Sequence, residues 1–476
     1  MFKRKLNKNG FAPSHNQSSL PKSFAADCQE LFNLGKAYKS TGDHQQAVTW
    51  FREAIRLKPD EPNAWIEYAG SLRSIRKYTQ AFSALEHALS LSPHHIGASL
   101  NMGLLHYQLS QYEHSTQYLR QVLESQPANM IAAQYLSHSY QRLGYTEQSL
   151  EVLRCALDLH PHSIELQRAL AFGLLLDGQF REAWPLYECR FSENGNNRVF
   201  PYCQTGLPLL TTLANTELKC LIVAEQGLGD NIQFSRFLPA FCHTFPSARF
   251  CCPRQIHPIL NSSFHCDTLD ISELDISEFD VWIPLLSLPR LLGIDSPSMI
   301  QSRPYLKAAK ISHLPHVSDA KTIVGIHWQG STSQEDGQLS VGRSFPLSLF
   351  EPLSLLTNVG LISLQIGLGT EQLQSCTFLD SFIRNPLLDH SESLLETANL
   401  IQSCDLVITN DTSIAHLSGG LGVKTYVLLK KYPDWRWGLK ASTSYWYSSV
   451  TLFRQKIDGS WDDVFTNVIS AVTQEI

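Results

Sequence analysis

The chain has 476 residues, too many for one ordinary hydrophobic core, so at least two domains are expected. Its formal net charge is −6, and its basic residues are scattered apart from the N-terminal KRKLNK, which argues against a nucleic-acid groove as the main function. The 11 cysteines include no C-x-x-C pair, a pattern that argues against structural zinc and suits free thiols in the cytoplasm.

The N-terminus predicts a disordered tail over residues 1–27. This stretch is polar and carries Ser, Asn and Pro, and FAPSHNQSSLPKS stands where a secretory signal would need an unbroken apolar run. No stretch elsewhere approaches the ~18 apolar residues of a membrane span. We therefore expect neither a signal peptide nor a transmembrane segment.

A repeat of 34 residues runs through the first third of the chain. Prolines at positions 59, 93, 127 and 161 mark it, and windows that start at 28, 62, 96, 130 and 164 align large apolar residues with small ones. Small residues let the two helices of a hairpin approach closely, and large ones fill the space between hairpins. The aligned small residues include Gly35, Gly103, Ser115, Ser137, Ser149 and Ala183.

This spacing resembles a tetratricopeptide-repeat (TPR) array, an α-solenoid, over residues 28–195. The fifth repeat departs after Ala183, where Trp184-Pro185 and Arg190 replace the expected helix and small residue. Such arrays usually offer a concave surface to a peptide or another domain. The alternative, that the repeats only brace the C-terminal part, stays open because a fold does not dictate a function.

From about residue 218 onward, short β-rich runs alternate with helical patterns, which predicts parallel strands joined by crossover helices. The runs are LKCLIVAE, ARFCCP, VWIPL, TIVGIHWQG, GLISLQI, CDLVITND and KTYVLL. After the first run, Phe234, Phe237, Leu238 and Phe241 lie on one face of a helix. We therefore expect an α/β part after the repeats.

Two polar turns follow strands of this part. In AEQGLGDNIQF, Asp230 falls at the helix start, and without further evidence it reads as an acid that caps the helix. In DLVITNDTSIAHLSGGLG, a turn at residues 410–413 precedes a short helix whose N-terminus offers amides to a phosphate. Two such crevices facing each other would make a nucleotide-sugar site.

Several motifs together resemble the glycosyltransferase family nine domain, whose members include the lipopolysaccharide heptosyltransferases. They are EQGLGDNIQFSRFLP, GIHWQG, RSFPLSLFEPL, LISLQ, ITNDTSIAHLSGGLG, PDWRWG and LFRQ. The resemblance implies a GT-B fold of two Rossmann-like halves, residues 218–310 on the acceptor side and residues 320–476 on the nucleotide-sugar side. It also implies inversion at the anomeric carbon, with no bound metal and no cofactor besides the nucleotide-sugar substrate.

The resemblance assigns roles to residues of the two turns. Asp230 matches the proposed base of the family, which takes the proton from an acceptor hydroxyl. Asp411 matches a family acid that binds the sugar hydroxyls or the nucleotide, and Thr412 and Ser413 supply the turn and its amides. His416, one helical turn beyond Thr412, is either a further contact or a satisfied core histidine.

Cationic and polar residues between these turns complete the expected donor site. Arg343 follows the polar loop STSQEDGQLSVG, where the family carries a basic residue that meets the phosphates. The hydroxyls of Ser331 and Thr332 add donors in the same loop. Gln365, at the end of LISLQ, is a weaker candidate contact.

Two tryptophans stand in the late motif PDWRWG. Trp435 and Trp437 flank Arg436 after a strand, a place from which aromatic faces can stack on a base or a sugar. Packing of both rings inside the domain is the alternative interpretation.

The sequence thus predicts an inverting, metal-independent glycosyltransferase. It would move a sugar from a nucleotide-sugar donor to a protein, peptide or glycan acceptor that the repeats position, with no nucleic-acid partner. The alternative is a non-catalytic repeat scaffold with a degenerate glycosyltransferase-like domain.

Overall fold

The computed structural model describes residues 27–191, 205–311, 322–330, 342–383 and 393–475. The chain divides into two compact units, residues 1–127 and 128–476. This division falls inside the repeat array, so the predicted domain limits at 195, 218, 310 and 320 stay predictions. The predicted tail and the candidates Ser331 and Thr332 lie outside the described residues.

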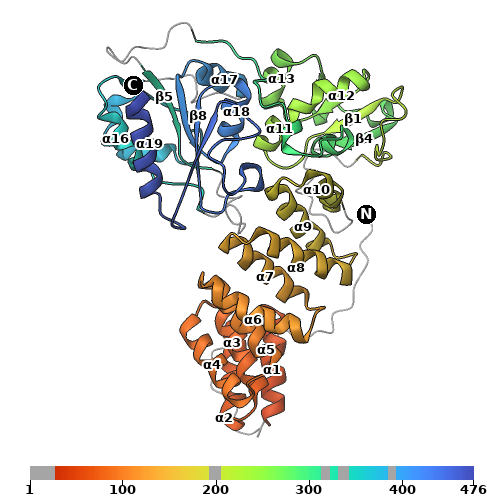
Figure 1. The fold of residues 1–476 in the computed structure, drawn as a ribbon, viewed down its shortest axis with the longest axis vertical. Helices are drawn as coiled ribbons and strands as arrows, with labels where there is room; N and C mark the ends of the chain where they lie inside the picture. Colours follow the sequence, from red (N-terminus) through yellow and green to blue (C-terminus); the bar gives the residue numbers. More distant parts are fainter. Residues whose placement is uncertain (1–26, 192–204, 312–321, 331–341, 384–392, 476) are drawn as a thin grey trace, which may run out of the picture. The chain divides into compact units, whose positions relative to one another are not determined.

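The repeats are built from consecutive helix pairs, and each predicted window begins a helix (Figure 1). In the first unit the helices are α1 (Cys28–Ser40), α2 (His44–Leu57), α3 (Pro62–Ser74), α4 (Tyr78–Leu91), α5 (Ile96–Gln108) and α6 (Tyr112–Ser125). In the second unit they are α7 (Met130–Leu143), α8 (Thr146–Leu159), α9 (Ile164–Asp177) and α10 (Phe180–Tyr187).

Small residues set the close approach of the paired helices, as the repeat predicts. A Cβ atom on Gly35 would lie 2.6 Å from the ring of Phe51, and one on Gly103 would lie 2.7 Å from Leu119. The hydroxyl of Ser115 donates to the carbonyl of Gly103 at 2.9 Å. Contacts this short exclude larger side chains, so the 34-residue pattern records helix-to-helix packing.

The fifth repeat ends differently because its second helix joins the α/β part. After Tyr187 the chain continues as the 3-10 helix η1 (Glu188–Phe191), which carries Arg190. The Arg190 guanidinium binds both carboxylate oxygens of Glu225, with Nε–Oε2 at 2.8 Å and Nη2–Oε1 at 3.0 Å. Glu225 is fully buried, and Leu286 also donates its backbone N–H to it at 2.8 Å. The departure at Arg190 therefore creates a buried, bidentate link between the repeats and the α/β part.

The α/β part contains two parallel sheets, in agreement with the expected α/β class. The first has the order β3-β2-β1-β4, built from β1 (Cys220–Val223), β2 (Arg249–Cys251), β3 (Asp267–Leu269) and β4 (Val281–Pro284). The second has the order β6-β5-β7-β8-β9, built from β5 (Thr322–His327), β6 (Val359–Ser363), β7 (Leu406–Asn410), β8 (Thr425–Leu429) and β9 (Val450–Arg454). Every pairing between these named strands is parallel.

Helices cover the faces of these sheets (Figure 1). The helices that alternate with or follow the strands of the first sheet are α11 (Leu228–Phe234), α12 (Leu238–Thr244), α13 (His257–Ser263) and α14 (Leu288–Leu291). Those of the second sheet are α16 (Glu351–Ser354), α17 (Leu394–Gln402), α18 (Ser413–Leu421) and α19 (Asp462–Glu475). One face of the second sheet shares a core with α19, where Val464, Phe465 and Val468 are buried. Strands β7 and β8 are buried along their whole length, as expected for a parallel sheet covered on both faces.

Two details of the α/β part differ from the sequence prediction. Strands β3 and β9 were not predicted, and β3 is a three-residue edge strand with no strong β pattern. The helix expected after β1 is broken, because the 3-10 helix η2 (Ser235–Phe237) separates α11 from α12 and Pro239 stands at the start of α12. The predicted apolar face is nevertheless buried.

The described part of the chain contains no helix with the length and apolar character of a membrane span.

Replacing Arg190 tests the link between the repeats and the α/β part. Arg190→Met should lower the unfolding free energy of the protein by about 3–5 kcal/mol, because it leaves the Glu225 carboxylate buried without its partner. Chemical denaturation measures this. The matched control is Arg181→Met, since Arg181 pairs with Asp295 at 2.8 Å but its side chain is 84% exposed. That control should change stability by less than about 1 kcal/mol, and equal losses in the two variants would contradict the prediction.

Candidate functional site

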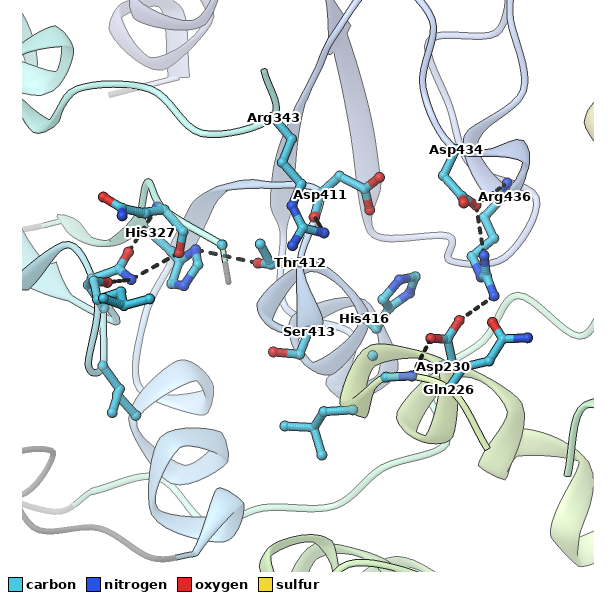
Figure 2. A pocket seen from close by; sticks show the side chains of 18 residues that line it. Gln226, Asp230, His327, Arg343, Asp411, Thr412, Ser413, His416, Asp434 and Arg436 are labelled. Atoms are coloured by element: carbon cyan, nitrogen blue, oxygen red, sulfur yellow. Dashed lines mark hydrogen bonds and ion pairs between the residues drawn. The ribbon is translucent and has the colours of Figure 1, made fainter. Parts of the chain in front are cut away.

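A cavity of about 510 Å³ lies between the turns that follow β1, β5, β6, β7 and β8 (Figure 2). Its walls therefore come from both sheets of the α/β part. The lining includes most of the residues predicted from the sequence: Asp230, Arg343, Gln365, Asp411, Thr412, Ser413 and His416. The residues of the second sheet meet because the carboxyl ends of its parallel strands share one edge, and the turn after β1 of the first sheet brings Asp230 to the same cavity.

Asp230 is the third residue of α11 and faces the cavity with a side chain that is 20% exposed. Its Oδ2 accepts a hydrogen bond from the backbone N–H of Gly227 at 2.9 Å, and its Oδ1 pairs with Nη2 of Arg436. Burial raises the pKa of Asp230, although the charge of Arg436 opposes this. Asp230 thus caps its helix and also presents a carboxylate to the cavity.

Arg436 is a functional candidate that the sequence analysis missed. Its side chain is buried, with Nη1 at 2.8 Å from Oδ1 of Asp434 and Nε at 2.7 Å from Oε1 of Gln233. One guanidinium therefore holds the carboxylates of Asp230 and Asp434 together (Figure 2). A lone arginine between two tryptophans was the available signal, but its partner Asp230 lies 206 positions away.

The two tryptophans that flank Arg436 are buried and do not line the cavity. Trp435 is 6% exposed and packs against Trp184, with ring centroids 6.0 Å apart. Trp437 is 2% exposed and stacks on His416 at 5.2 Å. Their positions agree with the packing interpretation and leave no open face for a base or a sugar.

The second turn leaves the first amides of α18 open to a ligand. Thr412 is the N-cap residue, in an extended conformation, and its side chain makes no capping hydrogen bond. The N–H of Ala415 donates to the carbonyl of Thr412 at 3.0 Å, so the amides of Ser413 and Ile414, the first two of this nine-residue helix, are the ones that can bind an anion. Thr412 and Ser413 both line the cavity.

Arg343 lies beside this helix N-terminus. Its Nη1 donates to the backbone carbonyl of Asp411 at 3.3 Å. Its guanidinium also lies over Gly330, where an added Cβ atom would come within 2.8 Å of the Arg343 Nε. Gly330 therefore allows the guanidinium and the first turn of α18 to share one wall of the cavity. A cation next to open amides suits a phosphate group.

Asp411 lies between Arg343 and Arg436 in the cavity (Figure 2). Burial and the negative charge of Asp434 raise its pKa from the ordinary 3.8 to about 6. The opposing effects of Trp437, Arg343 and Arg436 are smaller. A carboxyl group with such a pKa changes its charge close to neutral pH, which is common in functional sites.

Gln365 lines the cavity, but its amide is fully engaged in the fold. Its Oε1 accepts from the N–H groups of Trp328 at 3.2 Å and Gln329 at 3.0 Å. Its Nε2 donates to the carbonyls of Gln329 at 2.9 Å and Leu368 at 2.6 Å. These bonds make Gln365 a support of the loops after β5 and β6.

His416 joins α18 to α11. Burial lowers its pKa well below the ordinary value, so the ring is neutral, and its Nδ1 lies 2.9 Å from the hydroxyl of Tyr447. A Cβ atom on Gly229 would lie 2.9 Å from the His416 ring, and 3.4 Å from the Cα of Ser413. The second glycine of GLGD thus permits the two helix starts to meet, while His416 remains at the cavity wall.

His327 is a second cavity residue that the sequence analysis missed. It is the last residue of β5, is 7% exposed, and lies 2.8 Å through Nδ1 from Oδ1 of Asn410. Burial lowers its pKa to about 4, and the charge of Arg343 acts in the same direction. His327 lies inside the GIHWQG motif, and no spacing rule singles out a histidine at that position.

Among the described residues, no group of three or more His, Cys, Asp or Glu side chains is arranged to hold a metal ion. Reaction without a metal or a cofactor stays a prediction.

Comparison with known families supports the repeat part. A family model described as the middle TPR-like domain of cilia and flagella-associated protein 70 matches residues 24–152, less than half of the chain. Together with the helix pairs, this match confirms a TPR-like N-terminal part. The resemblance of the α/β part to glycosyltransferase family nine, and its GT-B arrangement, stay predictions. A search of curated proteins finds no match.

Solved structures with some likeness include the following two proteins. MamA of Desulfovibrio magneticus RS-1 is 22% identical, with a TM-score of 0.30, over 34% of this chain and 90% of that one. A thermophilic TPR protein of Thermus thermophilus is 19% identical, with a TM-score of 0.32, over 36% of this chain and 93% of that one.

The raised pKa of Asp411 predicts a gain in stability when its charge is removed. The folded-state pKa, about 6, lies above the ordinary 3.8, so ionisation costs the folded state free energy that is fully present above pH 6. Asp411→Asn should therefore raise the unfolding free energy by about 1–3 kcal/mol at pH 8, and the gain should shrink steadily as the pH falls toward 4.

Denaturation at several pH values measures this difference. Asp380→Asn is the control, because Asp380 is exposed and its replacement removes the same charge from the surface. A loss of stability in Asp411→Asn at pH 8, or a gain independent of pH, would show that ionisation of Asp411 does not destabilise the folded protein.

Proposed function

We propose that the α/β part is an inverting glycosyltransferase that uses a nucleotide-sugar donor, and that the repeats position a protein, peptide or glycan acceptor. The observation that carries the proposal is one shared cavity. The turn with Asp230 lines one side of it, and Arg343 with the first turn of α18 lines the other. The first offers a proton acceptor, and the second offers a site for a diphosphate. Both functions are needed for sugar transfer without a metal.

The donor would bind with its diphosphate against Arg343 and the first turn of α18. A nucleoside diphosphate leaves with developing negative charge, which a guanidinium and open amides can stabilise. The contact between Arg343 and the Asp411 carbonyl, together with the space above Gly330, supports this position for the cation. Asp411 lies close enough to this wall to bind sugar hydroxyls.

The acceptor would approach Asp230. Its hydroxyl oxygen attacks the anomeric carbon, the bond from that carbon to the diphosphate breaks, and the hydroxyl proton passes to the Asp230 carboxylate. The ion pair with Arg436 favours the charged form of Asp230, so the group would be an ionised acceptor at neutral pH although burial raises its pKa. The backbone bond from Gly227 fixes its direction.

A non-catalytic scaffold is the second candidate function. The observation that favours it is the engagement of Asp230, because each of its two carboxylate oxygens already has a partner, Oδ1 in Arg436 and Oδ2 in the N–H of Gly227. The TPR-like match also concerns only the repeats. In that case the α/β part would bind a ligand, or a partner, without turnover.

Binding of a nucleoside diphosphate is the first test of the proposed diphosphate site, which consists of Arg343 and the first turn of α18. In buffer with EDTA, at least one of UDP, GDP and ADP should raise the melting temperature, since a ligand at 100 times its dissociation constant adds about 2.7 kcal/mol to stability. Arg343→Ala should weaken that binding about 10- to 100-fold, the loss expected for charged hydrogen bonds.

The control is Arg303→Ala, because Arg303 is exposed and its Nη2 only contacts Gln301. It should bind the nucleotide as the parent does. If none of the three nucleotides stabilises the parent, or if Arg343→Ala binds like the parent, the proposal of a diphosphate site at Arg343 and α18 is wrong.

Turnover of Asp230→Asn separates the enzyme from the scaffold. If Asp230 is the base, transfer should fall by ~10²–10⁴-fold while nucleotide affinity stays close to that of the parent. Capping alone predicts almost no change in stability, because Asn caps nearly as well as Asp. The ion pair changes that expectation: Arg436 loses one of its two carboxylates, so the melting temperature should fall.

Asp434→Asn is the matched control, since it also takes one carboxylate from Arg436. It should lower the melting temperature comparably but reduce transfer much less. Equal losses of transfer in both variants would assign the effect to the position of Arg436, and a folded, active Asp230→Asn would remove Asp230 from the mechanism.

A further inference from the structure

The tautomer of His327 is determined by its neighbour Asn410. The Asn410 Nδ2 donates to the backbone carbonyls of Trp328 and Arg343, both at 3.2 Å. The amide oxygen of Asn410 must therefore face His327, at 2.8 Å from Nδ1. Because an amide oxygen only accepts, Nδ1 carries the proton of the ring and Nε2 carries a lone pair.

The Nε2 atom of His327 has no hydrogen-bond partner among the described residues, although the side chain is buried to more than nine-tenths and lines the cavity. Its pKa of about 4 keeps the ring neutral at physiological pH. The groups that face the ring are Asn410, the hydroxyl of Thr412 at 3.4 Å from Nδ1, and the charge of Arg343. His327 therefore presents one acceptor, and no donor, to the cavity through Nε2.

The chemistry of a lone acceptor restricts what can lie against it. A phosphate oxygen at neutral pH carries no proton and would be repelled by the Nε2 lone pair, whereas a hydroxyl group can donate to it. In Figure 2, His327 and Asp230 lie on opposite sides of Arg343 and Asp411. If the diphosphate lies against Arg343 and the reacting sugar lies toward Asp230, the nucleoside lies toward His327.

We propose that the Nε2 atom of His327 accepts a hydrogen bond from a hydroxyl of the donor, on the ribose next to the diphosphate, and so helps to select ribonucleotide over deoxyribonucleotide donors. This inference rests on the proposed donor site. It makes His327 a specificity-determining residue, with Asn410 as the residue that sets its tautomer.

Two substitutions of His327 separate its two nitrogen atoms. In His327→Asn the amide nitrogen stands as many bonds from Cα as Nδ1, so the bond to Asn410 is kept and the acceptor at Nε2 is lost. In His327→Gln the amide oxygen stands as many bonds from Cα as Nε2, so an acceptor returns at that position. His327→Asn should remain folded and bind the ribonucleotide about 3- to 10-fold more weakly, and His327→Gln should recover part of this loss.

Deoxynucleotides locate the hydroxyl. The probes are UDP, GDP and ADP, each with its 2′-deoxy and 3′-deoxy forms. The parent should bind one deoxy form about 3- to 10-fold more weakly than the ribonucleotide, and His327→Asn should bind the two equally. This non-additivity is the expected result. If His327→Asn weakens binding of the ribonucleotide and of both deoxy forms by the same factor, the ribose assignment is overturned.

A sugar hydroxyl is the other source of the same chemistry. Comparison of UDP with UDP-glucose distinguishes it: for a ribose contact, His327→Asn weakens both ligands equally. A loss confined to UDP-glucose would place the contact on the transferred sugar and overturn the ribose assignment.

Nitrogen NMR of the imidazole provides a readout that a purely structural role would not move. In the free parent protein the ring of His327, assigned by its loss in His327→Asn, should show a protonated Nδ1 and an unprotonated Nε2 across neutral pH. Addition of the ribonucleotide should shift the Nε2 resonance, and the matching deoxy form should shift it less. A protonated Nε2 in the free protein, or no response to a bound ribonucleotide, would overturn the inference.

The two proposals fail in different ways. If no nucleotide binds and Arg343→Ala has no effect, the donor site itself is wrong. If the nucleotide binds through Arg343 but binding does not depend on His327, only the present inference is wrong.

Discussion

The buried pair of Arg190 and Glu225 is the constraint on which the arrangement of the site depends. Glu225 follows closely after β1 and immediately precedes the turn that carries Asp230, so the guanidinium from the last repeat fixes the end of the strand and the start of the turn together. The next residue, Gln226, has φ of 58°, a left-handed conformation that is costly for a side chain, and its Nε2 donates to the Tyr187 hydroxyl at 2.6 Å. The repeat end thus binds the turn at its residue of unfavourable backbone conformation.

Aromatic packing extends this constraint to the other side of the cavity. Trp184 of α10 contacts Phe234 of α11 and Trp435, with ring centroids 6.4 Å and 6.0 Å apart, and its indole donates to the carbonyl of Ile294 at 2.8 Å. The Trp184 ring therefore contacts one segment that follows a strand of the first sheet and another that follows a strand of the second. The substitution of Trp184 and Arg190 into the last repeat has a physical purpose: it converts a repeat helix into the support of the cavity. A brace and a binding surface are both compatible with such an array.

Local rules predicted the parts of the structure that depend on local spacing. The repeat windows could be predicted because Gly35 and Gly103 meet partners within the same helix pair. Asp230, Arg343 and Asp411, which line one cavity, were proposed together from the family resemblance, with Asp230 and Asp411 in turns that follow predicted strands. Arg436 and His327 could not be found this way, because their roles depend on Asp230 and Asn410, which are distant in sequence. The tryptophans of PDWRWG show the same limit, since only the fold decides whether an aromatic ring is buried.

The charges of the cavity divide along its length, and this division gives the site a direction (Figure 2). At one end two carboxylates share the single cation Arg436, so this end keeps a net negative charge, whereas near the middle Arg343 lies beside the first amides of α18. In the proposed function, an anionic ligand would bind at the middle, and its neutral ends would extend toward Asp230 and toward His327. Asp411 lies where the two regions meet, and the rise of its pKa to about 6 is the consequence of burying an acid there. Folding would favour a neutral residue at this position, so the free energy spent on the carboxylate is intelligible as a requirement of the ligand rather than of the fold.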